Sequence, residues 1–111
     1  MELADRAEAP PVLLIDSLGT WLAQHLDDAE PPWLERQQQF VDSLAAQRGP
    51  VLLVVEEVGL GVVPPTTVGC LFRDRMGACQ QLLMQQAVAS WWVVAGRAVD
   101  LHAVGHLVPG D

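Results

Sequence analysis

Two acidic residues that follow short apolar runs could take part in phosphate or metal chemistry. Asp16 directly follows the run 12–15, and Glu57 lies just beyond the run 51–55. In open α/β sheets, ligands bind in the crevice at the carboxyl ends of the strands. Carboxylates placed there could hold Mg²⁺ beside the phosphates of a nucleotide. For Asp16 the alternative is a helix N-cap, which is the commoner role of an aspartate before a helix.

A loop with two glycines and a proline follows the second acidic residue. Gly59, Gly61 and Pro64 all lie within the stretch 57–64. Glycine allows the backbone to approach a ligand closely, and proline fixes where the chain turns. The local pattern leaves two interpretations open, because a tight strand-to-helix turn uses the same residue types.

An arginine and an aspartate, Arg73 and Asp74, come shortly after this loop. Arg73 could pair with a phosphate, with Asp74 or with Glu57, and a plain Arg–Asp pair on a helix is an equally good interpretation. A phosphate cradle needs a glycine-rich turn and a cation, and the P-loop motif G-x-x-x-x-G-K-[ST] is absent. The chain has no Lys, and its cations are Arg6, Arg36, Arg48, Arg73, Arg75 and Arg97.

The composition predicts one small acidic domain. The chain has 111 residues, half of them hydrophobic, and a formal net charge of −8. This charge argues against a nucleic-acid or anionic-membrane surface, because phosphate backbones require clustered cations. Cys70 and Cys79 are too far apart on one helix to form a disulfide, and they indicate a reducing compartment. Without an apolar leader or a membrane-spanning stretch, we expect a cytoplasmic protein.

Hydrophobic patterns and stop signals predict an α/β domain over residues 12–104, with a loose leader at 1–11 and an irregular tail at 105–111. Continuous apolar runs predict strands that are buried on both faces. Helices between the strands favour a mostly parallel sheet, and the short last connection favours a hairpin that adds an antiparallel edge strand. We expect strands at 12–15, 51–55, 92–95 and 98–104, and helices starting near 18, 31 and 68.

From Pro11 onward, the chain resembles the bifunctional adenosylcobinamide kinase / adenosylcobinamide-phosphate guanylyltransferase family of cobalamin biosynthesis. Residues 12–22 resemble the family's Walker-B-type strand and the helix after it, and residues 92–96 resemble its last strand. The most specific part of the resemblance is the spacing of Glu57, Gly59, Gly61, Pro64, Arg73, Asp74 and Gly77.

The resemblance implies a RecA-like P-loop fold of which this chain is the C-terminal part, truncated at the N-terminus. It also implies nucleotide-dependent phosphorylation of adenosylcobinamide and then GMP transfer, with Mg²⁺ and GTP or ATP. The family's P-loop and its guanylylated histidine belong to the N-terminal portion. A separate chain that carries the P-loop is therefore an expected partner, and a homo-oligomer is expected if the fold is intact.

Roles for the candidate residues follow from the pattern and the resemblance together. We expect Asp16 to orient Mg²⁺, directly or through water, and Glu57 to orient metal-bound water or a substrate hydroxyl. Two departures from the family weaken the expected contacts. The segment Gly77-Ala78-Cys79-Gln80 replaces a usual Gly-Arg-x-Asn, and Glu56 stands where a neutral polar residue is common.

Two functions of different class remain open at this stage. The chain could be a fragment or split subunit of the enzyme, active only with a partner that carries the P-loop. Alternatively, it could be a non-catalytic remnant or an interaction module. The remaining polar and aromatic candidates are interpreted as structural, namely His25, His102, His106, Trp91 and Trp92.

Overall fold

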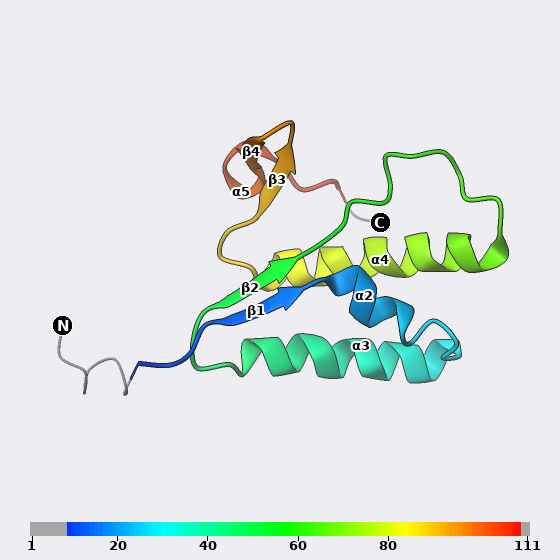
Figure 1. The fold of residues 1–111 in the computed structure, drawn as a ribbon, viewed down its shortest axis with the longest axis horizontal. Coiled ribbons are helices and arrows are strands. Elements are labelled where there is room, and N and C mark those ends of the chain that lie inside the picture. Colours follow the sequence, from blue (N-terminus) through cyan, green and yellow to red (C-terminus); the bar gives the residue numbers. More distant parts are fainter. Residues whose placement is uncertain (1–8, 110–111) are drawn as a thin grey trace.

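The computed structural model describes residues 9–109 as an α/β arrangement (Figure 1). The elements follow one another along the chain as β1 (Leu13–Asp16), α2 (Leu18–Ala23), α3 (Glu30–Ala45), β2 (Val51–Val54), α4 (Thr67–Gln86), β3 (Trp91–Val94), β4 (Arg97–Asp100) and α5 (Leu101–Val104). The predicted order of strands and helices is confirmed up to β4.

Strands β1 and β2 form a parallel pair. Leu13 lies opposite Val51, and Asp16 lies opposite Val54. The connection through α2 and α3 supplies the crossover that parallel strands require. Figure 1 shows α3 running alongside this pair and the β3–β4 hairpin on its other side. Because the strands are parallel, the residues that follow each of them leave the sheet at the same end.

The core lies where α2, α3 and α4 meet. The start of α3 agrees with the predicted start near 31, where Pro31 and Pro32 suit the first turn, and Trp33 and Val41 are buried. Trp21 stacks on Phe40 with the ring centroids 4.1 Å apart. Burial raises the pKa of the Cys79 thiol to about 11. The central cluster consists of Leu18, Leu22, Trp33, Met76 and Cys79.

The prediction that the strands are buried on both faces is wrong. Residues of β1 and β2 alternate between half-buried and exposed. Leu14 is 62% exposed and Leu52 is 57% exposed. All four residues of β3 are exposed. Burial on both faces requires a covering layer on each side, and within residues 9–109 the helices cover one face of the parallel pair.

The prediction that the last strand adds an antiparallel edge to the parallel sheet is also wrong. β3 and β4 do form an antiparallel hairpin, but this hairpin is a separate two-stranded sheet. Ala95 and Gly96 have φ of 51° and 72°, which is the backbone of a two-residue type I′ turn. The predicted strand 98–104 stops at Asp100, whose carboxylate accepts the N–H of Ala103 at 3.1 Å and so caps the short helix α5.

The described part of the chain is expanded for its length. Its radius of gyration is 16.4 Å, whereas a compact domain of about 100 residues has ~13 Å. Residues 9–11 and 105–109 have no helix or strand, and the rest of the predicted leader and tail lies outside the described residues. Among residues 9–109, no helix combines the length and the hydrophobicity that a membrane span requires.

Candidate functional site

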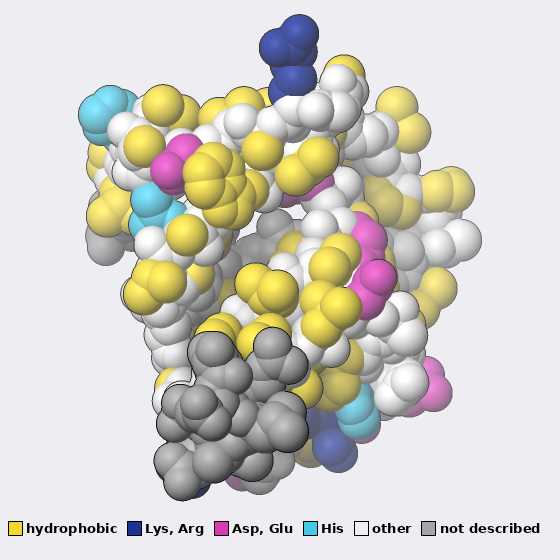
Figure 2. All heavy atoms as spheres, turned by 60° about the vertical axis from the view of Figure 1, so that its left-hand side comes forward, with side chains coloured by type: hydrophobic (Ala, Val, Ile, Leu, Met, Phe, Trp, Pro, Cys, Tyr) yellow, Lys and Arg dark blue, Asp and Glu magenta, His cyan; other side chains and the backbone are white. Residues whose placement is uncertain are grey.

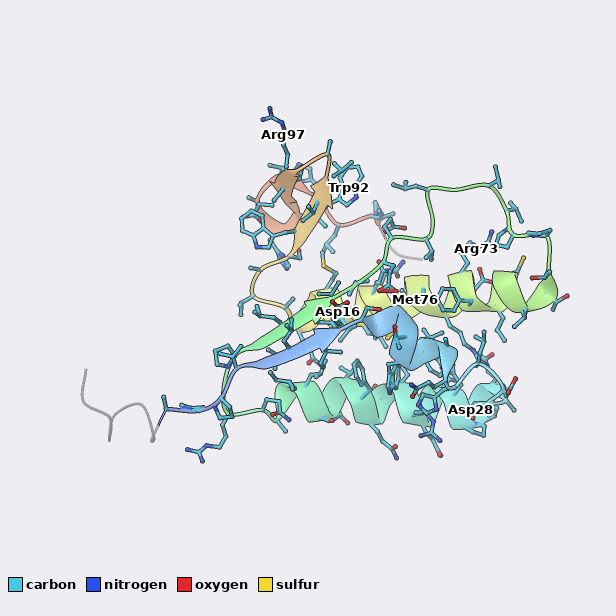
Figure 3. The ribbon with its side chains drawn as sticks, in the orientation of Figure 1. Asp16, Asp28, Arg73, Met76, Trp92 and Arg97 are labelled. Atoms are coloured by element: carbon cyan, nitrogen blue, oxygen red, sulfur yellow. The ribbon has the colours of Figure 1, made fainter. Side chains whose placement is uncertain are left out.

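Asp16 ends β1 and is exposed at the junction with α2 (Figure 3). The residue that caps α2 is its neighbour Ser17, whose Oγ accepts the backbone N–H of Thr20 at 3.4 Å. The alternative interpretation of Asp16 as the N-cap is therefore wrong. Within residues 9–109 the Asp16 carboxylate has no hydrogen-bond partner, so it is available to a ligand.

Glu57 leaves the sheet at the same end, three residues beyond the end of β2 at Val54. Its Oε1 accepts the backbone N–H of Gly59 at 2.7 Å. A Cβ at Gly59 would lie 2.9 Å from this oxygen, so the glycine lets the loop close on the carboxylate. The structure thus places Asp16 and Glu57 at one end of the parallel pair, with Glu57 turned toward its own loop.

Glu56 is a carboxylate that sequence reasoning did not select for the site. Its Oε1 is buried and has no hydrogen-bond partner within the described part. A Cβ at Gly19, in the first turn of α2, would clash with Glu56 Oε2. The backbone carbonyl of Glu56 accepts from Gln80 Nε2 at 2.9 Å. The signal that could have revealed this contact is the glycine at position 19, because glycine is unfavourable in a helix unless something needs the space.

The glycine loop is built as a turn into α4. Pro64 packs on the first turn of this helix, since a Cβ at Gly69 would lie 2.9 Å from Pro64 Cβ. Thr66 caps α4 by accepting the N–H of Gly69 at 3.0 Å. Gly61 is exposed and has open space where a side chain would be. The residues from 64 onward are therefore explained by helix initiation. Gly61 is free to face a ligand, whereas the N–H of Gly59 is bonded to Glu57.

Arg73 pairs with its neighbour Asp74. Its Nε and Nη2 lie 3.2 Å and 3.1 Å from Asp74 Oδ1. Within the described residues, Arg73 therefore contacts Asp74 and not Glu57, as the plain Arg–Asp interpretation predicts. In Figure 3, Arg73 lies on the side of α4 that faces the loop after β2. An exposed ion pair contributes little stability, so Arg73 can give up Asp74 and pair with a phosphate instead.

Arg75 is a second arginine that the sequence did not single out, and it is 6% exposed. Its Nη2 donates to the carbonyl of Asp28 at 2.8 Å, and its Nη1 lies 3.4 Å and 3.5 Å from the carbonyls of His25 and Leu26. The guanidinium also lies 5.0 Å from the ring centroid of Trp33. Arg75 therefore holds the α2–α3 connection against α4.

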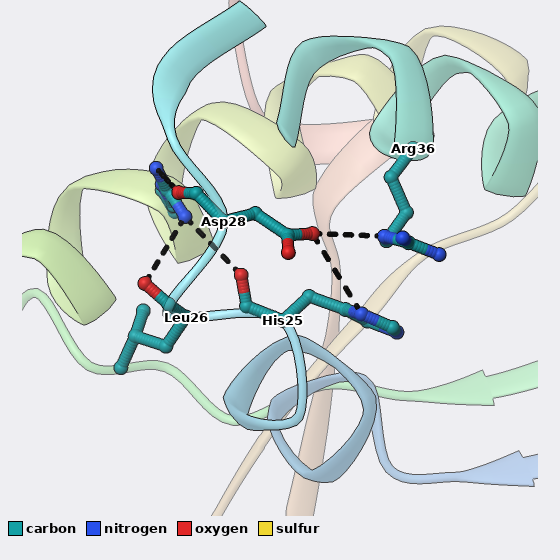
Figure 4. A network of polar contacts seen from close by, with 5 residues as sticks. His25, Leu26, Asp28 and Arg36 are labelled. Carbon is teal, nitrogen blue, oxygen red and sulfur yellow. Dashed lines mark hydrogen bonds and ion pairs between the residues drawn. The ribbon is translucent and has the colours of Figure 1, made fainter. Parts of the chain in front are cut away.

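The side chain of Asp28 ties the same connection to α3 (Figure 4). Its Oδ2 accepts from Arg36 Nε at 2.9 Å and lies 3.8 Å from His25 Nδ1. His25 is thus engaged in local contacts, in line with its interpretation as a structural residue. These contacts hold the α2–α3 connection against the start of α3.

A cavity of about 370 Å³ lies between β2, the second half of α4 and the hairpin. We name it the β2–β3 cavity. Glu57 lines it, and Asp16 is not among its lining residues. Its lining also includes residues 51–55, Leu83, Met84, Trp91 and Trp92.

No group of three or more His, Cys, Asp or Glu among residues 9–109 is placed to hold a metal ion. Mg²⁺ in phosphate-binding enzymes is often held by one or two carboxylates, with phosphates and waters completing its shell. The exposed carboxylate of Asp16 fits this second kind of site, because it has no other partner.

Fold and site together define an α/β protein whose candidate ligand site lies at the carboxyl ends of parallel strands and consists of carboxylates and a glycine loop. A family model described as cobinamide kinase / cobinamide phosphate guanyltransferase matches residues 1–101. The chain belongs to this family.

Curated relatives agree with the family. The bifunctional adenosylcobalamin biosynthesis protein CobP of Pseudomonas aeruginosa is 31% identical over 100 residues, which are 89% of this chain and 58% of that protein. The bifunctional adenosylcobalamin biosynthesis protein CobU of Escherichia coli is 42% identical over 59 residues, which are 51% of this chain and 33% of that protein. The chain thus matches only part of the length of each of these relatives.

Proposed function

We propose that this chain supplies one part of a cobinamide kinase / cobinamide phosphate guanyltransferase, with the carboxylates at the ends of β1 and β2 as its contribution to the site. The observation that supports this most is the family match over residues 1–101. The parallel register of β1 and β2 adds to it, because it brings Asp16 and the Glu57 loop to the same end of the sheet.

The proposed roles follow from the chemistry of each side chain. Asp16 would hold Mg²⁺ directly or through water, and this ion would neutralise charge on the phosphates of GTP or ATP. Glu57, released from Gly59, would accept a hydrogen bond from a substrate hydroxyl on the cobinamide. Gly59 and Gly61 would bring backbone N–H groups to the ligand, and Arg73 would exchange Asp74 for a phosphate.

Positioning and charge stabilisation supply most of the catalysis of phosphoryl transfer. The chain contains no Lys, so the lysine that a P-loop places against the terminal phosphates must come from elsewhere. We therefore propose that the activity requires the remaining part of the family's length, on a partner chain or on the same polypeptide. We also propose a cytoplasmic location and a homo-oligomer for the assembled enzyme.

Nucleotide binding tests this proposal. The probe is GTP with Mg²⁺, measured by calorimetry with this chain alone and with the chain assembled with the unmatched part of the Pseudomonas aeruginosa relative. We expect binding only in the assembly, and we expect Asp16→Asn to weaken it about tenfold, equivalent to ~1.4 kcal/mol. Asp27→Asn is the matched control, because Asp27 is also an exposed aspartate.

Two results would contradict the proposal. Binding by the chain alone would show that the described residues suffice, and binding to the assembly that ignores Asp16→Asn would remove the assigned role. An assembly that never binds GTP would instead favour the second candidate, an interaction module without catalysis. The many exposed large hydrophobic side chains, such as Trp91 at 57% and Val93 at 68%, give that candidate its support.

A further inference from the structure

A second cavity, of about 300 Å³, lies between α3 and α4. We name it the α3–α4 cavity. Each helix lines it with residues at the spacing i, i+3, i+4 and i+7, which form one face of a helix. α3 contributes positions 30, 33, 34 and 37, and α4 contributes positions 71, 74, 75 and 78. Asp16 and Glu57 are not in its lining, so the cavity is separate from the carboxyl ends of the strands.

Half of the lining of this cavity is apolar. Trp33, Leu34 and Leu71 contribute large hydrophobic side chains. Ala78 belongs to the lining as well, and its single methyl group leaves space that a longer side chain on α4 would fill. Small-molecule pockets measure ~300–1,000 Å³ and combine apolar walls with a few placed polar groups. The volume and the walls therefore suit a small ligand with an apolar body.

Two residues of the α3–α4 cavity each hold a buried polar atom without a partner. Gln37 and Arg75 line the cavity, and each is 6% exposed. Within the described residues, Gln37 Oε1 and Arg75 Nε have no hydrogen-bond partner. A buried polar atom without a partner destabilises the folded chain. A ligand that supplies the missing hydrogen bonds therefore binds with more than its apolar contacts.

The β2–β3 cavity does not offer this combination. Figure 2 shows hydrophobic side chains on both sides of a hollow between the hairpin and the rest of the molecule. The third buried side-chain atom without a partner among the described residues is Glu56 Oε1, and Glu56 does not line the β2–β3 cavity. The α3–α4 cavity is thus the better candidate for specific recognition of a small molecule.

The two atoms without partners have opposite hydrogen-bonding roles. Gln37 Oε1 is an acceptor, and Arg75 Nε carries a hydrogen that it donates. The Nη atoms of Arg75 already contact the carbonyls of the α2–α3 connection, so Nε is the donor that remains. The amide of Gln37 turns easily about its last torsion, which has no sharp minima. A matching ligand group must donate to Gln37 and accept from Arg75.

The charges around the cavity favour a neutral group. Asp74 pairs with Arg73 at 3.1 Å. This leaves Glu30 and Arg75 in the lining, one carboxylate and one guanidinium. An anionic ligand would be repelled by the first, and a cationic ligand would be repelled by the second. A neutral group that carries both a donor and an acceptor avoids both repulsions.

We infer that the α3–α4 cavity binds a small molecule through a primary carboxamide. The amide N–H donates to Gln37 Oε1, and the amide oxygen accepts from Arg75 Nε–H. The apolar body of the ligand packs against Trp33 and Leu71, in the space that Ala78 leaves open. A carboxylate has no donor for Gln37, and an amidinium has no acceptor for Arg75. This inference goes beyond the proposed function, because it needs neither a nucleotide nor a partner chain.

NMR titration of the full chain tests the inference with three probes of nearly equal shape, namely benzamide, benzoate and benzamidinium. We expect benzamide to shift the indole N–H signal of Trp33 and the Nε–H signal of Arg75 in a saturable way, with a dissociation constant on the order of 1 mM. Benzoate and benzamidinium should bind at least about tenfold more weakly, because each lacks one of the two hydrogen bonds and meets a like charge.

Three variants locate the binding. Gln37→Leu removes the acceptor at similar volume and should weaken benzamide binding about tenfold. Gln39→Leu is the matched control, because Gln39 is an exposed glutamine of α3 outside the cavity. Ala78→Leu fills the space for the ligand and should weaken binding at least about tenfold. Its fold should persist, because position 78 is exposed and leucine is a good helix former.

Binding that is lost in Gln37→Leu and in Ala78→Leu but kept in Gln39→Leu would support the carboxamide site. Tighter binding of either charged probe would overturn it, as would full binding by Gln37→Leu. The absence of a saturable shift up to about 10 mM benzamide, ten times the expected dissociation constant, would also overturn it. If Gln37→Leu does not fold, Ala78→Leu and the order of the three probes decide. No nucleotide is present in these measurements, so none of the results bears on the proposed function.

Discussion

The helical side of the parallel strand pair and its hairpin side differ sharply in packing. On the helical side, Leu22 and Met76 are fully buried. On the hairpin side, Trp91 is 57% exposed and Val93 is 68% exposed, although both belong to a regular strand. Hydrophobic side chains thus have opposite environments on the two sides. The difference teaches that an apolar strand is buried only where another layer packs on it, and the helices supply such a layer on one side of the pair.

The largest effect is expected when a side chain on each of the two sides is shortened to alanine. Leu22→Ala should lower the free energy of unfolding by ~2–5 kcal/mol, because it opens a cavity in a fully buried cluster. Val93→Ala should change it by less than ~0.5 kcal/mol, because its side chain is already exposed. Urea denaturation followed by circular dichroism measures both. Equal losses would mean that the hairpin side is packed as tightly as the helical side.

A second test addresses the buried arginine of the helical side. Arg75→Lys should cost ~1–3 kcal/mol, because one ammonium cannot reach the three carbonyls that the guanidinium contacts. Arg36→Lys is the control, since its ion pair with Asp28 is exposed, and its effect should stay below ~1 kcal/mol. Thermal unfolding of both variants provides the comparison, and a neutral Arg75→Lys would remove its assigned anchoring role.

A third test examines the contact between α2 and the loop after β2. Gly19→Ala should destabilise by ~1–2 kcal/mol, because the added methyl collides with the Glu56 carboxylate. In a Glu56→Ala background the same change should be neutral or stabilising, because alanine is the better helix former. A double-mutant cycle measures the coupling between the two sites. Additive effects would show that Glu56 does not occupy this space.

The smallest expected effect concerns the hairpin turn. Ala95→Asn should stabilise the hairpin by ~0.5–1 kcal/mol, because asparagine tolerates the positive φ of 51° at this position better than alanine. Slower amide exchange in β3 and β4 would report the gain. Ala98→Asn, at an exposed position of β4, should bring none. An unchanged Ala95→Asn variant would argue against the type I′ turn.

Much of the fold was predictable because local patterns determine local structure. The expected helix start near 31 marked the beginning of α3, and the apolar run 51–55 marked β2. The stretch 101–104 was not predictable as a helix, because its single turn depends on one capping contact from Asp100. Periodicity cannot show such a contact.

The candidate site was predictable in part. The position of Asp16 and Glu57 at the carboxyl ends of the strands was predictable, because acidic residues after apolar runs mark the ends of strands. Glu56 and Arg75 were missed, since their importance arises from Gly19 and from the carbonyls of residues 25–28, which are distant in sequence. Residues that meet only in the folded structure have no fixed spacing in the sequence, so a single sequence does not reveal their contact.

The sequence by itself determined the element types up to β4, the parallel connection and the family, because hydrophobic periodicity, caps and motif spacing are local properties. Only the tertiary structure decided which faces of the strands are covered, and that the hairpin is a sheet of its own. Coverage depends on how many layers pack on a strand, and an apolar run has the same sequence whether its covering layer is present in the chain or must come from elsewhere.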